Sequence, residues 1–158
     1  MRLAEIEAQL QPLRDSKQWG MLMTAHAKVG HAERALGMLN EMRKAGVAPE
    51  VYNYSRAITI CEKRREWPRA LSLLDEMRKA GVAPDVYSYS AAISACEKGG
   101  QWQRALSLLD EMRKAGVKPN VISYSAAISA CDKGREWRHA LSLLDEMRAA
   151  GVNPNVIS

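Results

Sequence analysis

Apolar residues recur along the chain in paired runs, each at the spacing of one helix face. In residues 86–98, Tyr89, Ala92, Ile93 and Cys96 lie at positions i, i+3, i+4 and i+7. Gly99 and Gly100 then interrupt the pattern. A second run over residues 101–115 gathers Trp102, Ala105, Leu106, Leu109 and Met112 on one face, which Leu108 widens. The pattern predicts a hairpin of two helices whose apolar surface is too broad to be buried within the hairpin alone.

The sequence of this hairpin recurs along the chain at a fixed interval of 35 residues. The segment ALSLLDEM occurs at residues 70–77, 105–112 and 140–147, and a looser copy occupies 35–42. We therefore expect repeats at 16–50, 51–85, 86–120 and 121–155, with 156–158 beginning a fifth, and a lead or capping helix in 1–15 that uses Leu3, Ile6, Leu10 and Leu13. A period of this length is typical of stacked repeat arrays. The predicted fold is all-α: a right-handed superhelical α-solenoid.

Gly116, Pro119 and the basic residues before them predict where the second helix ends. Arg113 and Lys114 suit a helix C-terminus, Gly116 is expected at the position after the cap, and Pro119 prevents continuation. Asp110 and Lys114 are i, i+4 partners.

Composition narrows the possible functions. The net charge of +5 is compatible with a polyanionic partner. No apolar run is long enough to span a membrane, and the first residues resemble neither a secretory signal nor a transit peptide. Cys61, Cys96 and Cys131 are spaced by 35 residues without any CxxC pair, so we expect reduced core thiols and no metal site or other cofactor.

Polar and flat side chains form a second stripe on the first helix of each repeat. Tyr87, Ser90, Ser94 and Lys98 are spaced by three, four and four residues, which places them on one line along a helix. The neighbouring repeats supply Tyr52, Ser55, Thr59 and Lys63, and Ile122, Ser125, Ser129 and Lys133. Stacking would turn these residues into parallel tracks, including one of Lys28, Lys63, Lys98 and Lys133.

A lysine track beside flat side chains suits single-stranded nucleic acid. Phosphates would meet the ammonium groups, bases would stack, and short polar side chains would contact base edges. The alternative is a solvated polar face on which each lysine lies near a helix C-terminus. The repetition of all three tracks in the same register favours the nucleic-acid interpretation.

The repeat SYSAAISACEKGGQWQRALSLLDEMRKAGVKPN closely resembles those of the pentatricopeptide repeat family. The resemblance covers residues 16–158, and the related 34-residue tetratricopeptide repeat fits less well. It implies single-stranded RNA binding in chloroplasts or mitochondria, with one base contacted by each repeat through its fifth and last residues. The base-reading pairs it implies are Ser55 with Asp85, Ser90 with Asn120, and Ser125 with Asn155, and the residues that wedge between bases are Tyr52, Tyr87 and Ile122.

In the family, a small hydroxyl with Asp favours guanine and with Asn favours adenine, which implies a preference for 5′-GAA-3′. The lysine track matches the family's phosphate contacts. The first repeat departs from the pattern, with Lys17, Gly20 and Glu50 at the wedge, fifth and last positions, so we expect it to cap the stack.

The sequence can also be compared with two other classes of function, a structural subunit and an enzyme. A solenoid can serve as a structural subunit of a large organellar assembly, holding a protein segment instead of RNA. Enzymatic activity is not expected, because the sequence has no phosphate-binding glycine loop, metal-ligand cluster or nucleophile with a base beside it.

Overall fold

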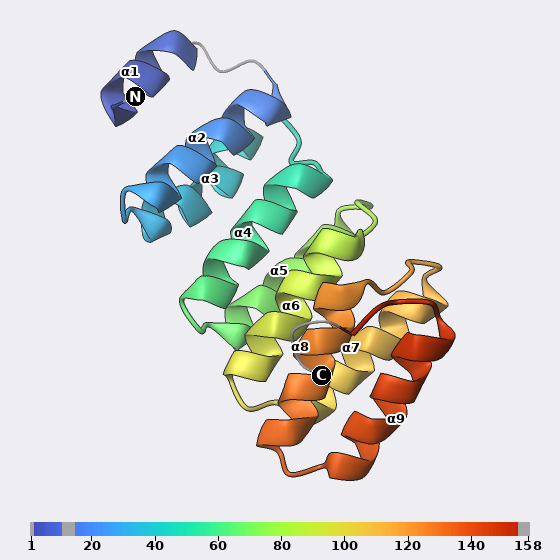
Figure 1. The fold of residues 1–158 in the computed structure, drawn as a ribbon. Coiled ribbons are helices and arrows are strands. Elements are labelled where there is room, and N and C mark those ends of the chain that lie inside the picture. The colour runs from blue at the N-terminus through green and yellow to red at the C-terminus, as the bar shows by residue number, and fades with distance from the viewer. Residues whose placement is uncertain (1, 11–14, 155–158) are drawn as a thin grey trace.

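The computed structural model describes residues 2–10 and 15–154, and over these ranges all of its regular secondary structure is α-helix (Figure 1). It contains α1 (Leu3–Leu10), α2 (Ser16–Lys28), α3 (Ala32–Lys44), α4 (Val51–Lys63), α5 (Trp67–Lys79), α6 (Val86–Lys98), α7 (Trp102–Lys114), α8 (Val121–Lys133) and α9 (Trp137–Ala149). Within this part of the chain no helix is both long and apolar enough to cross a membrane.

Among the described residues, helices α2 to α9 pair into four hairpins that stack side by side (Figure 1). The first helices α2, α4, α6 and α8 contact one another directly in sequence. Each of α3, α5 and α7 packs against the first helix of its own hairpin and against that of the next, whereas the backbones of the described second helices do not approach one another closely. The layer of first helices is therefore the more closely spaced one, which makes it the inner layer of the array. The predicted all-α solenoid is confirmed.

Local signals in the sequence explain the helix boundaries. After α7, Gly116 has φ of 78°, the N–H of Val117 donates to the carbonyl of Met112 at 3.0 Å, and that of Gly116 donates to Arg113 at 2.9 Å. This is the Schellman arrangement, in which a left-handed residue satisfies the last free carbonyls. The predicted position of Gly116 is thus confirmed, as is the ion pair between Lys114 and Asp110, at 3.0 Å.

The core is continuous through the stack and contains the residues that the helical spacing predicted. Tyr89, Ala92, Ile93 and Cys96 are buried, as are Ala105, Leu108, Leu109 and Met112, while Trp102 and Leu106 pack partly buried against them. All three cysteines are buried free thiols. Burial raises the pKa of Cys61 and of Cys96 to about 11, and it also raises that of Cys131. These thiols are therefore protonated at neutral pH and behave as small apolar groups.

An arginine near the end of each of α3, α5 and α7 ties neighbouring hairpins together. Arg78 donates to Glu111 of the next second helix at 2.8 Å and lies over the ring of buried Tyr89. Arg43 makes the same contacts with Glu76 and Tyr54, and Arg113 with Glu146 and Tyr124. Repetition of one contact at each junction explains why the period is held at 35 residues.

Tryptophan and glycine form a second matched contact between hairpins. A Cβ placed on Gly99 would overlap the indole of Trp67, and one on Gly134 would overlap that of Trp102. The glycines therefore let the indoles of the preceding repeat approach the backbone. Trp137, at the end of the array, is 62% exposed.

At the other end, α1 lies against α2 (Figure 1). Leu3 and Ile6 of this helix are partly buried against the core. The side chain of Leu10, Leu13 and the expected start of a fifth repeat at 156–158 lie outside the described residues.

Candidate nucleic-acid interface

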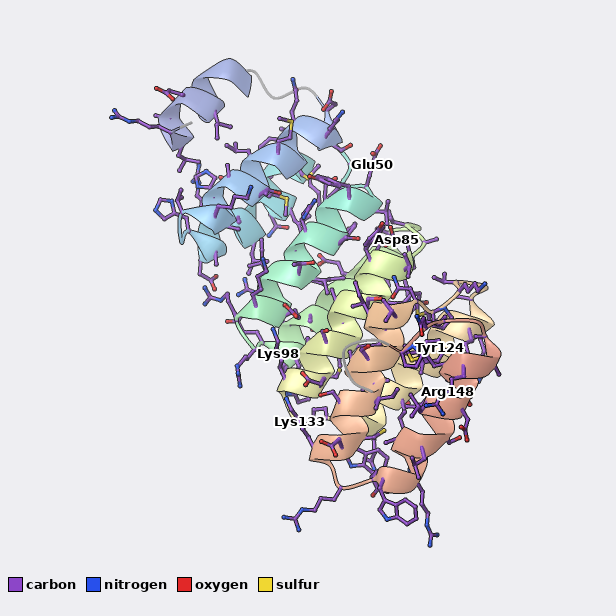
Figure 2. All side chains as sticks on the ribbon, viewed as in Figure 1. Glu50, Asp85, Lys98, Tyr124, Lys133 and Arg148 are labelled. Carbon is purple, nitrogen blue, oxygen red and sulfur yellow. The ribbon has the colours of Figure 1, made fainter. Side chains whose placement is uncertain are left out.

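The predicted base-reading and phosphate-binding residues lie toward opposite ends of the first helices. Figure 2 shows Glu50 and Asp85 where α4 and α6 begin, and Lys98 and Lys133 where α6 and α8 end. Because α4, α6 and α8 pack directly on one another, each kind of residue recurs along the inner layer. The stacked first helices thus place the two predicted tracks side by side.

A hollow of about 510 Å³ opens between the predicted wedges Tyr52 and Tyr87. Ser55, Arg56, Thr59 and Asp85 also line it. The Ser55 hydroxyl donates to Asp85 Oδ1 across 3.4 Å, so the two predicted reading residues of this repeat face the same space. Tyr52 and Tyr87 are exposed, by 39% and 69%. We call this hollow the repeat-2 slot; it combines two flat rings with a hydroxyl and a carboxylate.

Helix capping fixes the orientation of the residues that end each repeat. Asp85 Oδ1 accepts hydrogen bonds from the backbone N–H of Ser88 at 3.0 Å and from its hydroxyl at 2.9 Å. Asn120 Oδ1 likewise accepts from the N–H groups of Ile122 and Ser123, at 3.0 and 3.1 Å. One side-chain atom is thereby used by the helix. The other atom is an acceptor in Asp85 and a donor in Asn120.

The other two predicted pairs are arranged differently. Ser90 is only 5% exposed, and its hydroxyl has no hydrogen-bond partner among the described residues. Ser125 is half-buried and Ile122 is 54% exposed, whereas Asn155 lies outside the described residues. A hydroxyl buried without a partner costs about 1–3 kcal/mol, which a hydrogen bond to a ligand would recover.

The four lysines of the track differ in whether a carboxylate lies beside them. Lys98 Nζ lies 3.0 Å from Glu62, and Lys133 Nζ lies 2.7 Å from Glu97, so each is paired with a carboxylate of the preceding repeat. Lys28 and Lys63 have no such carboxylate within the part of the chain that is described. The third repeat's Glu97 also accepts from the Ser129 hydroxyl at 2.8 Å. Burial opposes ionisation of Glu97, but the hydrogen bonds from Lys133 and Ser129 outweigh it and lower its pKa.

The first repeat has no open slot at its fifth position. A Cβ on Gly20 would overlap the ring of Tyr52, so that ring lies directly against the Gly20 backbone. Arg56 in turn lies over the ring of Tyr52, with its guanidinium carbon 4.9 Å from the ring centroid. Tyr52 is therefore the first of the predicted wedges to line a hollow with a reading pair.

Two features of this surface were missed by sequence reasoning. One is the pairing of Glu62 and Glu97 with lysines 36 residues further along the chain, a signal that is visible only when the repeats are aligned. The other is Arg56, which replaces the alanines found at the same position of the next two repeats. Among the described residues, no group of three or more His, Cys, Asp or Glu side chains is arranged to hold a metal ion.

Comparison with known families identifies the repeat. The sequence matches the model of the PPR repeat over residues 19–47, 52–82 and 122–152, and that of a pentatricopeptide repeat domain over residues 72–134. No curated protein matches the sequence at a significant level.

Solved structures give the same result for the fold. The chain is similar to the pentatricopeptide repeat protein PPR10 in complex with an 18-nt psaJ RNA element, at 32% identity and a TM-score of 0.81 over 97% of this chain and 23% of that one. It is similar to PPR10 from maize at 31% identity and a TM-score of 0.78, over 97% and 22% of the two chains. The chain thus spans less than a quarter of the length of PPR10.

A more distant structure has the same arrangement of helices. The PPR domain of Arabidopsis thaliana protein-only RNase P 1, in complex with tRNA, aligns with a TM-score of 0.81 at 14% identity, over 98% of this chain and 84% of that one. At this identity the similarity concerns the fold alone.

Proposed function

The chain belongs to the pentatricopeptide repeat family, and from this membership we propose that its inner layer binds single-stranded RNA, with one base in each slot between successive first helices. The observation that carries the proposal is the repeat-2 slot, in which two exposed tyrosines flank Ser55 and Asp85. Stacking on an aromatic side chain contributes about 1–3 kcal/mol per base. Support also comes from PPR10, which has been solved in complex with RNA.

We further propose that repeats two to four prefer 5′-GAA-3′. The capping geometry supplies a physical reason for the first two bases. Asp85 has an acceptor oxygen left for the N–H groups of guanine, whereas Asn120 has an amide N–H left for the ring nitrogen of adenine. The preference for adenine as the third base is proposed from Ser125 and Asn155 by the family pattern alone. The organelle, chloroplast or mitochondrion, is proposed from the family alone.

Exchanging the capping residues tests base reading without removing the cap. Asp and Asn cap helices equally well, so Asp85→Asn and Asn120→Asp should leave the fold intact. Asp85→Asn should shift the preferred strand from GAA to AAA, and Asn120→Asp should shift it to GGA. Affinities for short uridine-flanked strands should differ by about tenfold or more for each exchanged base. Equal affinity of the native protein for strands containing GAA and CUU would remove the base assignment.

Neutralising the lysine track separates RNA binding from a scaffold role. Glutamine is the suitable replacement at Lys63, Lys98 and Lys133, because glutamate would face Glu62 and Glu97 at the last two positions. The triple variant should lose most of its affinity for RNA and much of the salt dependence of binding. RNA binding that is unchanged would favour a protein partner on this face.

A further inference from the structure

The junction between the first two hairpins differs from the other two. A hollow of about 240 Å³ lies there between α2 and α4, next to the start of α3. Its cationic lining residues are Lys28, Arg56, Lys63 and Arg64, and Thr24, Ala27, Ala32, Thr59 and Ile60 complete the wall. We call it the junction hollow.

Ala32 and Arg64 account for the open space. At the two later junctions the equivalents of Ala32 are Trp67 and Trp102, whose indoles lie against Gly99 and Gly134. At the first junction the tryptophan is replaced by alanine and the glycine by arginine. Because a side chain at the glycine position would overlap the indole, the arginine is compatible only with the smaller residue.

Ala27 accounts for the excess of positive charge. Its equivalents are Glu62 and Glu97, which neutralise Lys98 and Lys133. With alanine at this position, Lys63 loses the carboxylate that the later lysines have. Arg56 adds a cation where those junctions have alanine. Arg64 is partly neutralised, since it lies 3.2 Å from Glu33 and 3.3 Å from Glu66, but Lys28, Lys63 and Arg56 have no ion pair within the described ranges.

The junction hollow lies next to the repeat-2 slot. Arg56 and Thr59 line both, so the two share a wall on α4. From Arg56 to Lys63 the helix rises about 10 Å, at about 1.5 Å per residue. The cations lie on the side of the first repeat, which is the side that the 5′ end of an RNA strand would face if it read 5′-GAA-3′ along repeats two to four.

We propose that the junction hollow binds the 5′ phosphate of the nucleotide whose base occupies the repeat-2 slot. This inference rests on the proposed RNA binding and adds to it a preference for a terminal phosphate, because the cations of this junction lack the carboxylate partners that Lys98 and Lys133 have. At about 240 Å³ the hollow is smaller than the ~300–1,000 Å³ typical of small-molecule sites, which suits a phosphate with part of its sugar. A terminal phosphate monoester carries a charge of about −1.5 to −2, and an internal diester carries −1, so the cations favour the terminal group.

The test compares GAA strands that begin with a 5′ phosphate or a 5′ hydroxyl. Native protein should bind the phosphorylated strand about tenfold more tightly at low salt, as expected for one charge-assisted contact. Equal affinities would overturn the proposal. Strands with uridines added before GAA separate the two sources of phosphate: retained high affinity means that a diester also fits, and a loss means that the site is specific for the terminal group.

Ala27→Glu is the informative variant, since it copies the carboxylate of the later junctions. It should pair with Lys63 and reduce the preference for the 5′ phosphate to less than about twofold. Ser107→Glu, exposed on α7, is the matched control with the same change of charge, and should keep the preference. Preservation of the preference in Ala27→Glu would contradict the proposal.

The double variant Ala32→Trp with Arg64→Gly is a second test, designed to fill the hollow without disturbing the fold. The double variant recreates the indole-glycine contact of the later junctions, so it should fold while the hollow is filled. It should also lose the preference for the 5′ phosphate. Using strands that begin with CUU distinguishes this inference from base reading: if GAA and CUU bind equally but the phosphate effect remains, base reading is wrong and the phosphate site stands.

Discussion

Two arginines adopt a backbone conformation that this chain otherwise gives to glycine. Arg65 and Arg135 follow the first helices α4 and α8 with φ of 60° and 59°, and Gly100 occupies the same position after α6 with φ of 69°. Their N–H groups close the same type of turn, donating to Glu62, Asp132 and Glu97. A residue with a Cβ costs about 1–2 kcal/mol in this region, so the two arginines are local sources of strain.

Arg135→Gly should therefore stabilise the protein. We expect an increase of about 1 kcal/mol in the free energy of unfolding, which corresponds to about 2–4 °C in melting temperature for a chain of this size. Thermal and urea unfolding followed by circular dichroism would measure it. Gly100→Ala is the reciprocal control and should lower stability by a similar amount. A loss of stability in Arg135→Gly would show that the arginine side chain contributes more than its backbone costs.

At the scale of helices, the inner and outer surfaces use glutamates in different ways. Glu76 and Glu111, on the second helices, bind arginines that tie the hairpins together. Glu62 and Glu97, on the first helices, bind lysines of the proposed RNA surface. The inner glutamates thus stabilise the stack while reducing the charge available to phosphates.

Replacing both inner glutamates should lower the stability of the fold and raise its affinity for RNA. Glu62→Gln with Glu97→Gln should lower the free energy of unfolding by about 1 kcal/mol and raise RNA affinity several-fold, because Lys98 and Lys133 become available. Filter binding or fluorescence anisotropy over a range of salt concentrations should show a steeper salt dependence. Glu76→Gln with Glu111→Gln changes the net charge equally, away from the lysines, and should leave the salt dependence unchanged. Equal effects of the two pairs would refute a specific role for the inner pairs.

The lowered pKa of Glu97 predicts how the stability of the protein depends on pH. The pKa of Glu97 is lowered in the folded protein, so its ionised form contributes stability at pH values above about 4.5. That contribution is lost as the pH falls through the folded-state pKa. The difference in stability between the native protein and Glu97→Gln should accordingly shrink under acidic conditions.

At the scale of the whole molecule, repetition explains why the fold could be predicted from the sequence. Each contact between hairpins recurs in the same register, so the period and helical spacing were enough to predict the solenoid, its core and the position of Gly116. The pairing of Lys98 with Glu62 was not predictable in the same way, because helical spacing describes one helix and this pair joins two. The junction hollow depends on four departures from the repeat, at Ala27, Ala32, Arg56 and Arg64, whose proximity only the structure shows.

Repetition also predicts how the array responds to extension. Trp137 and Leu141 are exposed by 62% and 53% at the end of the stack, and Arg148 has no tyrosine or glutamate partner within the described residues. A further copy of residues 121–155, joined after residue 155, would present a glycine to Trp137 and both partners to Arg148. Because stability in stacked repeats is approximately a sum of repeat and junction contributions, the midpoint of urea unfolding should rise.

A matched extension distinguishes specific stacking from mere added length. In the copy, the equivalent of Gly134 changed to Ala would place a Cβ against the indole of Trp137, as at the two existing tryptophan junctions. This second extended protein should therefore show a smaller rise in the unfolding midpoint than the first. If both rise equally, the indole-glycine contact does not govern the junction. If neither rises, the hairpins do not transmit stability through their contacts, and the lines of slots and lysines could not be extended repeat by repeat to bind a longer RNA.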